Sequence, residues 1–272
     1  MIDIKKDFLI MGILNVTPDS FSDGGRYFAV QDAVARGIEM AAEGADIIDV
    51  GGESTRPGAT PVAVEEEIKR VIPVIERLRQ ECPVRISVDT YKPDVAKAAV
   101  AVGASLINDV SASLAKQASE LGVGWIAMHM KANPMEMQVD PTYGNVLEEV
   151  GEYLFSKAKQ AKALGVSEIW IDPGIGFGKR VEDNLDLLAG LTKLVESNYP
   201  VIVGTSRKSF LGVLGATDPT QPVSVEDRLP GSLASAMWAL ALGAKMVRVH
   251  DVKETVQATG LLSLMTSEKE LA

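Results

Sequence analysis

The chain has 272 residues, 46% of them hydrophobic and 24% charged, which is the composition of an ordinary globular protein rather than a disordered one. Its net charge of −10 argues against a nucleic-acid partner, because binding to a phosphate backbone depends on clustered Lys and Arg, and leaves small molecules as the expected ligands. The one cysteine, Cys82, excludes an intrachain disulfide and a zinc site of several thiolates, so we expect a reducing, cytoplasmic compartment.

Eight short apolar segments recur along the chain, at residues 8–14, 46–51, 84–88, 105–108, 124–129, 168–172, 201–204 and 246–249. Between them lie segments with helical spacing, including residues 64–80, 94–102, 146–164 and 232–242. Strands that alternate with helices favour a parallel sheet, and eight such units predict a single (β/α)8 TIM-barrel domain over residues 1–272. No run approaches the ~18 apolar residues of a membrane span, so we expect no membrane partner.

The connections between these elements are unequal in length. The turns that lead from helix to strand are short, and each of five places a glycine where a left-handed helix C-cap is expected. These glycines are Gly44, Gly103, Gly122, Gly165 and Gly243. The connections from strand to helix are longer, at residues 15–30, 51–60, 130–145 and 206–227. Because long loops in compact domains are usually functional, they predict an active site at the carboxyl ends of the strands.

Hydrogen-bonding side chains end three of the predicted strands. Asp89, Asn108 and Asp172 each follow a buried apolar run. A buried carboxylate needs a partner, so each group must bond either with the protein or with a ligand. One interpretation is an internal network that holds loops in place. The other is a cradle for a heterocycle with alternating amino, ring N–H and carbonyl groups.

Cationic side chains follow the last two predicted strands. Lys208 lies in Ser206-Arg207-Lys208, and Arg248 and His250 stand two residues apart, so their side chains point to the same side of a strand. A solvated Arg is one interpretation of Arg248 alone. Together, the three cations indicate a phosphate or pyrophosphate site. A Walker-type phosphate loop is disfavoured, because Arg207 stands where that motif requires glycine.

Three further features leave their role open. The loop from Asn15 is a polar surface loop or an oxygen-rich lid, in which Asn15 ligates Mg²⁺ and Asp19 or Asp23 approaches a cationic intermediate. The glycine-rich run over residues 174–179 lacks the spacing of a dinucleotide fold, so a flexible turn and a functional loop are equally good interpretations. His129 lies between apolar residues, where a core histidine is at least as good an interpretation as a ligand.

Several motifs resemble the signatures of dihydropteroate synthase. They are residues 11–25 (MGILNVTPDSFSDGG), 49–58 (DVGGESTRPG), 172–179 (DPGIGFGK), 206–208 (SRK) and 248–251 (RVHD). The resemblance spans about residues 8–256, and residues 130–138 depart mildly from the family's Gly-Thr-Pro pattern. It implies a pterin-binding TIM barrel that condenses 6-hydroxymethyl-7,8-dihydropterin pyrophosphate with p-aminobenzoate, releasing pyrophosphate. It also implies Mg²⁺ as cofactor and a homodimer formed through the later helices.

The resemblance assigns roles by position in this chain. The pterin is held by Asp89, Asn108, Asp172 and Lys208. Pyrophosphate and Mg²⁺ are held by Asn15, Thr55, Arg56, Arg248 and His250, with Asn15 as the metal ligand. The p-aminobenzoate pocket maps to Arg56, Pro57, Phe177, Ser206 and Lys208. The expected catalytic residues are Lys208, Arg248 and His250, together with Asp19 and Asp23, which are added from their place in the first loop and not from the resemblance.

Three alternatives remain at this point. A folate- or corrinoid-linked methyltransferase domain has a similar barrel but needs no pyrophosphate groups, so the SRK and RVHD motifs disfavour it. A non-catalytic pterin-binding protein predicts loss of some anion or lid residues, and none is lost. A barrel enzyme for an unrelated phosphorylated metabolite is distinguished by whether a pterin binds at all.

Overall fold

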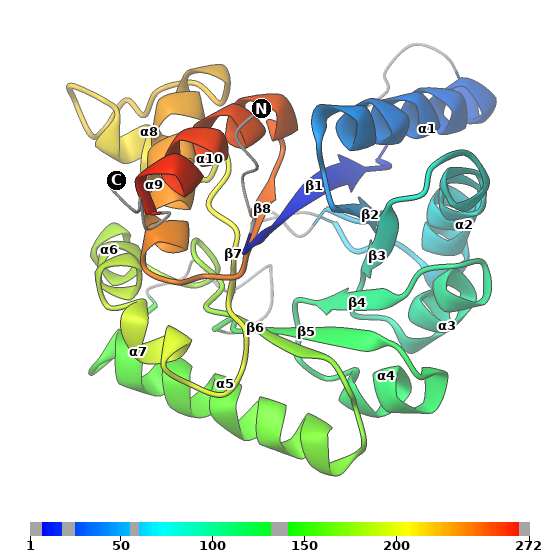
Figure 1. The fold of residues 1–272 in the computed structure, drawn as a ribbon, viewed down its shortest axis with the longest axis horizontal. Helices are drawn as coiled ribbons and strands as arrows, with labels where there is room; N and C mark the ends of the chain where they lie inside the picture. Colours follow the sequence, from blue (N-terminus) through cyan, green and yellow to red (C-terminus); the bar gives the residue numbers. More distant parts are fainter. Residues whose placement is uncertain (1–6, 18–24, 55–59, 132–140, 267–272) are drawn as a thin grey trace, which may run out of the picture.

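The structure is a computed structural model that describes residues 7–17, 25–54, 60–131 and 141–266. Its centre is a parallel sheet of eight strands, in the order β6-β5-β4-β3-β2-β1-β8-β7 (Figure 1). The strands are β1 (Leu9–Asn15), β2 (Ile47–Gly51), β3 (Arg85–Asp89), β4 (Leu106–Asp109), β5 (Gly124–Met128), β6 (Ile169–Asp172), β7 (Ile202–Val203) and β8 (Met246–Val249). A parallel bridge between Ile171 and Val201 joins β6 to β7, so the sheet forms a nearly closed barrel.

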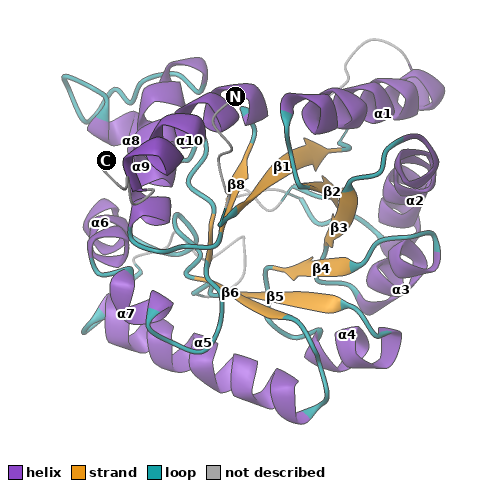
Figure 2. Cartoon of the chain, viewed as in Figure 1, coloured by secondary structure: helices purple, strands orange, loops and turns teal. Residues whose placement is uncertain are grey.

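Helices surround the ring of strands on its outside (Figure 2). They are α1 (Gly25–Glu43), α2 (Val64–Glu81), α3 (Pro93–Ala101), α4 (Ala115–Leu121), α5 (Val146–Ala163), α6 (Val181–Ala189), α7 (Thr192–Val195), α8 (Ser209–Leu214), α9 (Leu229–Ala241) and α10 (Val252–Thr266). This is the predicted TIM barrel, and all eight predicted strands are confirmed. In the part of the chain that is described, no helix is both long and apolar enough to cross a membrane.

The five glycines before strands adopt the backbone conformation that was predicted for them. Their φ angles lie between 68° and 120°, a region that side-chain-bearing residues avoid. Two of the predicted loops are shorter than expected. Helix α1 begins at Gly25, and α8 with a 3-10 turn at Glu226–Arg228 occupies part of residues 206–227. Both helices are hard to predict because they begin among polar and glycine residues.

The barrel interior is apolar at one end and polar at the other. Alternating strand residues form an apolar cluster of Met11, Ile47, Leu106, Ile126, Trp170, Ile202 and Met246. One step of two residues further along the same strands stand Asp49, Asn108, Asp172 and Arg248. Full burial of each large apolar side chain contributes roughly 1.5–3 kcal/mol to the free energy of folding. The apolar layer therefore stabilises the strands that carry the polar layer. That polar layer lies at the carboxyl ends of the strands, where barrel active sites lie.

Candidate functional site

The polar layer of the barrel is joined by hydrogen bonds around Arg248. Its Nε donates to Asp49 Oδ2 at 2.6 Å, and its Nη2 donates to Asp89 Oδ2 at 2.6 Å. Asn108 Nδ2 donates to the same Asp49 oxygen at 2.9 Å. Burial alone would lower the pKa of Arg248, but the two carboxylates together raise it, so the guanidinium is a fixed cation. One network therefore links β2, β3, β4 and β8.

Some oxygens of this layer remain without a hydrogen-bond partner among the described residues. They are Asp49 Oδ1, Asp89 Oδ1 and Ser87 Oγ, all buried. Burial raises the pKa of Asp89 to about 7, against the lowering effect of Arg248, and the like charge of Asp49 adds to the rise. Buried polar atoms are normally satisfied, so these oxygens are acceptors suited to a ligand with several N–H donors.

Asp172 and Lys208 form the opposite part of the site. Asp172, at the end of β6, accepts a hydrogen bond from Gly174 N at 2.7 Å, and burial raises its pKa. The ammonium of Lys208 donates to the carbonyl of Ile175 and lies 4.5 Å from the centre of the Phe177 ring. Burial lowers the pKa of Lys208 to about 8, while the charge of Asp172 acts in the opposite direction. A flat ring, a cation and a carboxylate therefore meet on this side.

Two residue pairs tie the loop after β7 to the loop after β8. Ser206 Oγ lies 3.0 Å from His250 Nδ1 and accepts from His250 N at 3.1 Å. Arg207 donates its Nε to Asp251 Oδ2 at 3.0 Å. Arg207 has a φ of 59°, unusual for a residue with a side chain, and its side chain is exposed while Ser206 is buried. The backbone turn thus directs Arg207 outward and leaves Ser206 in the site.

Asn15 closes the site from β1. It is paired in register with Gly51, and a Cβ built on Gly51 would lie 3.8 Å from Asn15 Oδ1 and 3.8 Å from Asp89 Oδ2. The amide oxygen of Asn15 and the carboxylate of Asp89 therefore flank the same glycine. Within residues 7–17, 25–54, 60–131 and 141–266, no group of three or more His, Cys, Asp or Glu side chains is arranged to hold a metal.

The glycine-rich loop after β6 is a shaped segment rather than a free turn. Gly174, Gly176 and Gly178 have φ angles of 64°, 82° and 61°. A Cβ on Gly174 would lie 1.9 Å from the carbonyl oxygen of His129, and one on Gly176 would lie 2.9 Å from Lys208 Cδ. The glycines let the loop approach β5 and Lys208 closely, while a functional role for the run stays a prediction.

Most site residues expected from the sequence meet at this end of the barrel. They are Asn15, Asp89, Asn108, Asp172, Phe177, Ser206, Lys208, Arg248 and His250. The expected residues Asp19, Asp23, Thr55, Arg56 and Pro57 lie outside the described residues. Arg248 also has partners that were not expected: it donates to Asp49 and Asp89, while its charge still acts on Lys208. The Arg side chain is long enough to reach past β1 to β2 and β3.

Sequence reasoning missed two members of this end of the barrel. Asp49 is fully buried and is the carboxylate that orients both Arg248 and Asn108. A charge within the apolar run of residues 47–50 was the available signal, because lone charges are rare in buried strands. Lys179 is also buried and contacts His129. Its position after a glycine-rich loop gave no sign of burial.

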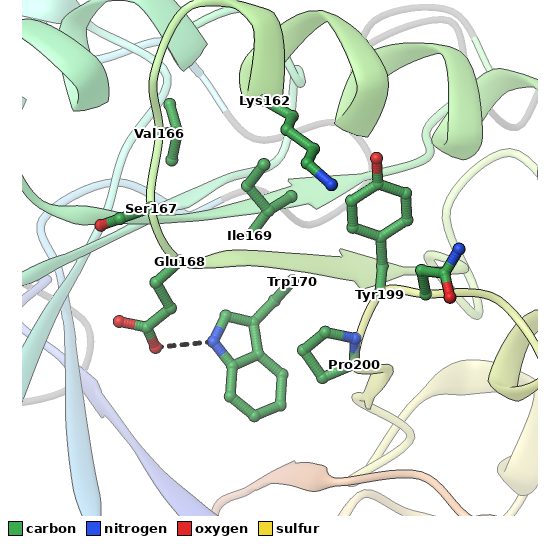
Figure 3. Close-up of a pocket in the computed structure, with 9 residues that line it drawn as sticks. Lys162, Val166, Ser167, Glu168, Ile169, Trp170, Tyr199 and Pro200 are labelled. Atoms are coloured by element: carbon green, nitrogen blue, oxygen red, sulfur yellow. Dashed lines mark hydrogen bonds between the residues drawn. The ribbon is translucent and has the colours of Figure 1, made fainter.

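A cavity of about 330 Å³ lies near the amino ends of β6 and β7, away from this polar layer. Figure 3 shows Trp170, Tyr199 and Pro200 around it, with Glu168 directed to the indole of Trp170. The carboxylate of Glu168 accepts from Trp170 Nε1 at 2.7 Å and from Arg85 at 2.6 Å. Its charge is therefore engaged within the protein, and the amino end of a barrel usually serves stability.

Comparison with known proteins agrees with this site. Residues 11–250 match the family described as pterin binding enzyme. Dihydropteroate synthase of Escherichia coli strain K12 is 46% identical over 267 residues, which cover 96% of this chain and 93% of that protein.

Two solved structures of Xanthomonas albilineans dihydropteroate synthase are similar as well. The one with 4-aminobenzoic acid is 44% identical, has a TM-score of 0.89 and covers 97% of this chain and 94% of its own. The one with 7,8-dihydropteroate is 42% identical, has a TM-score of 0.85 and covers 98% of this chain and 95% of its own. The chain therefore belongs to the pterin binding enzyme family, and within it to the dihydropteroate synthases.

Proposed function

We propose that this protein condenses 6-hydroxymethyl-7,8-dihydropterin pyrophosphate with p-aminobenzoate to give 7,8-dihydropteroate and pyrophosphate. The observation that carries the proposal is the buried polar layer. Its Asp49 and Asp89 oxygens that have no hydrogen-bond partner within the described part of the chain lie at the same end of the barrel as Lys208 and Phe177. Solved relatives are bound to 4-aminobenzoic acid, the proposed second substrate, and to 7,8-dihydropteroate, the proposed product.

The pterin half fits the carboxylates and amide of the layer. Its amino group and ring N–H groups are donors, and Asp89 and Asp172 present carboxylate oxygens to them. Asn108, held by Asp49, offers its amide oxygen. Lys208 supplies a donor to a ring acceptor and offsets the negative charge of Asp172. The ligand would in this way satisfy atoms that are costly to leave unpaired.

The pyrophosphate half fits the cationic side of the rim. His250 and Ser206 hold each other in place, and Arg248 adds a permanent positive charge nearby. Thr55 and Arg56 complete the anion site in this proposal. Mg²⁺ is the proposed cofactor, with Asn15 as its protein ligand and phosphate oxygens and water as the others, a mixture that Mg²⁺ commonly accepts. Bound there, the ion would neutralise charge on the leaving pyrophosphate.

The chemistry then follows from charge stabilisation. The bond between the pterin methylene carbon and the pyrophosphate oxygen breaks, and its electron pair leaves with pyrophosphate. Arg248 and His250 stabilise the charge that develops on the leaving group. The methylene cation is captured by the aniline nitrogen of p-aminobenzoate, which forms the C–N bond and loses a proton to solvent. Asp19 or Asp23 is proposed to face this cation.

The second substrate is placed by the side of the site that contains Lys208. Phe177 offers a ring face, Ser206 a hydroxyl and Lys208 a cation for the carboxylate-bearing aromatic amine, with Arg56 and Pro57 as further proposed contacts. Orienting the amine toward the methylene carbon and excluding water are the main tasks, since water would otherwise capture the cation.

A homodimer is also proposed, formed through the later helices. Large apolar side chains are exposed on α6, α9 and α10, where Leu185, Trp238, Leu261 and Met265 have 42%, 51%, 63% and 73% of their surface accessible. Such a group of apolar residues favours a protein interface. Light scattering after gel filtration should give twice the monomer mass, and Trp238→Glu should shift it toward the monomer. We further propose that the enzyme works in the cytoplasm on small molecules.

The deciding experiment is incubation with the pterin pyrophosphate, p-aminobenzoate and Mg²⁺, followed by detection of dihydropteroate and pyrophosphate in equal amounts. Lys208→Met is the inactive comparison, and the exposed Lys193→Met on α7 is the matched control. Pterin binding without product would contradict the synthase and favour a non-catalytic pterin-binding protein. Absence of pterin binding would favour an enzyme for another phosphorylated metabolite.

A further inference from the structure

Lys179 is a buried lysine whose hydrogen-bond partners, among the residues that the structure describes, are all uncharged. It is 4% exposed, and its Nζ lies 2.9 Å from His129 Nδ1, 3.0 Å from the carbonyl of Gly174 and 3.1 Å from the carbonyl of Phe177. The carbonyl of His129 is a fourth, longer contact at 3.4 Å. Burial lowers the pKa of Lys179 to about 7, because an ammonium among neutral groups loses its hydration, so this position calls for a role that outweighs its cost.

The histidine in this cluster acts as an acceptor. Burial, with the charges of Lys179 and Lys131, lowers the pKa of His129 to about 3, so its ring is neutral near pH 7. We assign Lys179 Nζ as the donor to Nδ1, because its other contacts are carbonyl acceptors, and this assignment puts the ring proton on Nε2. The ring also packs edge-on against Tyr153, with 5.0 Å between centroids. We therefore interpret His129, which follows β5, as a hydrogen-bond acceptor whose ring is held in place by Tyr153.

The loop between Asp172 and Lys179 is bound by two lysines through different carbonyls. Gly174 and Phe177 give their carbonyls to Lys179, whereas Ile175 gives its carbonyl to Lys208. The Phe177 ring lies against the ammonium of Lys208. Any movement of this loop would therefore move both the ring and the carbonyl that position Lys208.

We propose that Lys179 is a positioning residue for the aminobenzoate side of the site, because it ties the Gly174 and Phe177 carbonyls to His129 and so holds Phe177 against Lys208. This inference rests on the proposed function, in which Phe177 and Lys208 bind p-aminobenzoate. Asp172 is fixed by its strand rather than by the loop, because β6 pairs with β5 at Met128 and Asp172 and His129 N donates to the Asp172 carbonyl. Loss of Lys179 should accordingly affect the aromatic amine more than the pterin.

The first test compares Lys179→Met with Lys193→Met, a surface control on α7. We expect Lys179→Met to raise KM for p-aminobenzoate about tenfold, equivalent to about 1.4 kcal/mol, with KM for the pterin pyrophosphate changed less than about threefold. The control should change neither. Equal increases in both KM values, or no change in a folded variant, would overturn the proposal, since a general loss of packing does not distinguish the substrates.

A second pair of variants covers the case in which Lys179→Met does not fold. His129→Gln keeps an acceptor for Lys179, whereas His129→Leu removes it. The proposal requires near-normal KM for p-aminobenzoate in the Gln variant and the selective increase in the Leu variant. Identical behaviour of the two would overturn it.

The third test is independent of activity. The chain has two histidines, so ¹⁵N-edited NMR resolves their tautomers after one assignment variant. Wild-type His129 should remain neutral with its proton on Nε2 from about pH 5 to 8, and Lys179→Met should raise the pKa of His129, because burial then acts without the neighbouring cation. Lys131 remains in that variant, and Lys208, Lys131, Asp172 and Asp183 are the charges that act on Lys179 itself.

A proton on Nδ1 would overturn the proposal. Normal tautomers in a protein without synthase activity would instead contradict the proposed function.

Discussion

Arg248 donates its Nε to Asp49 Oδ2 at 2.6 Å, although 199 residues separate them in the chain. Asp49 also accepts from Asn108, so one fully buried carboxylate orients both a cation and an amide of the site. Asp49 itself was not expected from the sequence to belong to the site.

Replacing Asp49 with Asn should damage both stability and substrate binding. The variant keeps the shape of the side chain but removes one of the two charges that hold Arg248. Breaking a buried ion pair costs about 3–5 kcal/mol, and a displaced Arg248 should raise KM for the pterin pyrophosphate at least about tenfold. Urea unfolding and steady-state kinetics measure the two effects. Glu76→Gln, exposed on α2, is the control, and wild-type values for Asp49→Asn would show that Arg248 is positioned without it.

Activity should decline as pH rises through about 8. Burial lowers the pKa of Lys208 to about 8, and its cationic form is the one that binds substrate in the proposed function. Raising the pH above that value removes the proton, so kcat/KM should fall about tenfold per unit on the alkaline side. In Lys208→Arg the residual activity should lack this decline, because arginine stays charged. A decline at the same pH in that variant would assign it to another group.

Stability should decrease in acid because of His129. Its folded-state pKa of about 3 lies below the ordinary value of 6.5, so the unfolded chain binds more protons between these values. The contribution of His129 to the free energy of unfolding is therefore fully present above about pH 6.5. It decreases as the pH falls, by about 2 kcal/mol between pH 7 and pH 5. His129→Gln should remove this part of the pH dependence in urea unfolding. The raised pKa of Asp89 makes the folded protein more stable as the pH falls, which opposes the effect of His129. The effect of His129 is therefore measured as the difference between variant and wild type.

Two glycines with similar φ angles should respond differently to alanine. Gly174 has a φ of 64° and a Cβ there would meet the His129 carbonyl at 1.9 Å, whereas Gly122 has a φ of 68° and nothing within 4 Å. Gly122→Ala should cost about 1–2 kcal/mol, the penalty of a left-handed backbone. Gly174→Ala adds a backbone clash and should cost well over about 3 kcal/mol or prevent folding. Thermal unfolding of both decides, and equal losses would mean that the loop moves freely away from β5.

Local patterns account for the barrel and for the position of its site. The apolar segments and the glycines after helices depend on neighbours within a few residues, and both are confirmed by eight parallel strands and five positive φ angles. The short helix α8 and the early start of α1 were missed, because polar and glycine residues at their beginnings obscure helical spacing. The site residues at strand ends are brought together because parallel strands end at one edge of a barrel.

The sequence by itself determined the barrel, the face that carries the site and, through the long motifs, the family. Only the tertiary structure decided that Arg248 pairs with Asp49 and Asp89, that the glycine-rich loop is closely packed, and that Lys179 and His129 form a buried pair. The physical reason is that periodicity depends on residues close in sequence, whereas the pairing of buried charges depends on which strands the fold brings close together. Arg248 can reach Asp49 because β8 and β2 both flank β1.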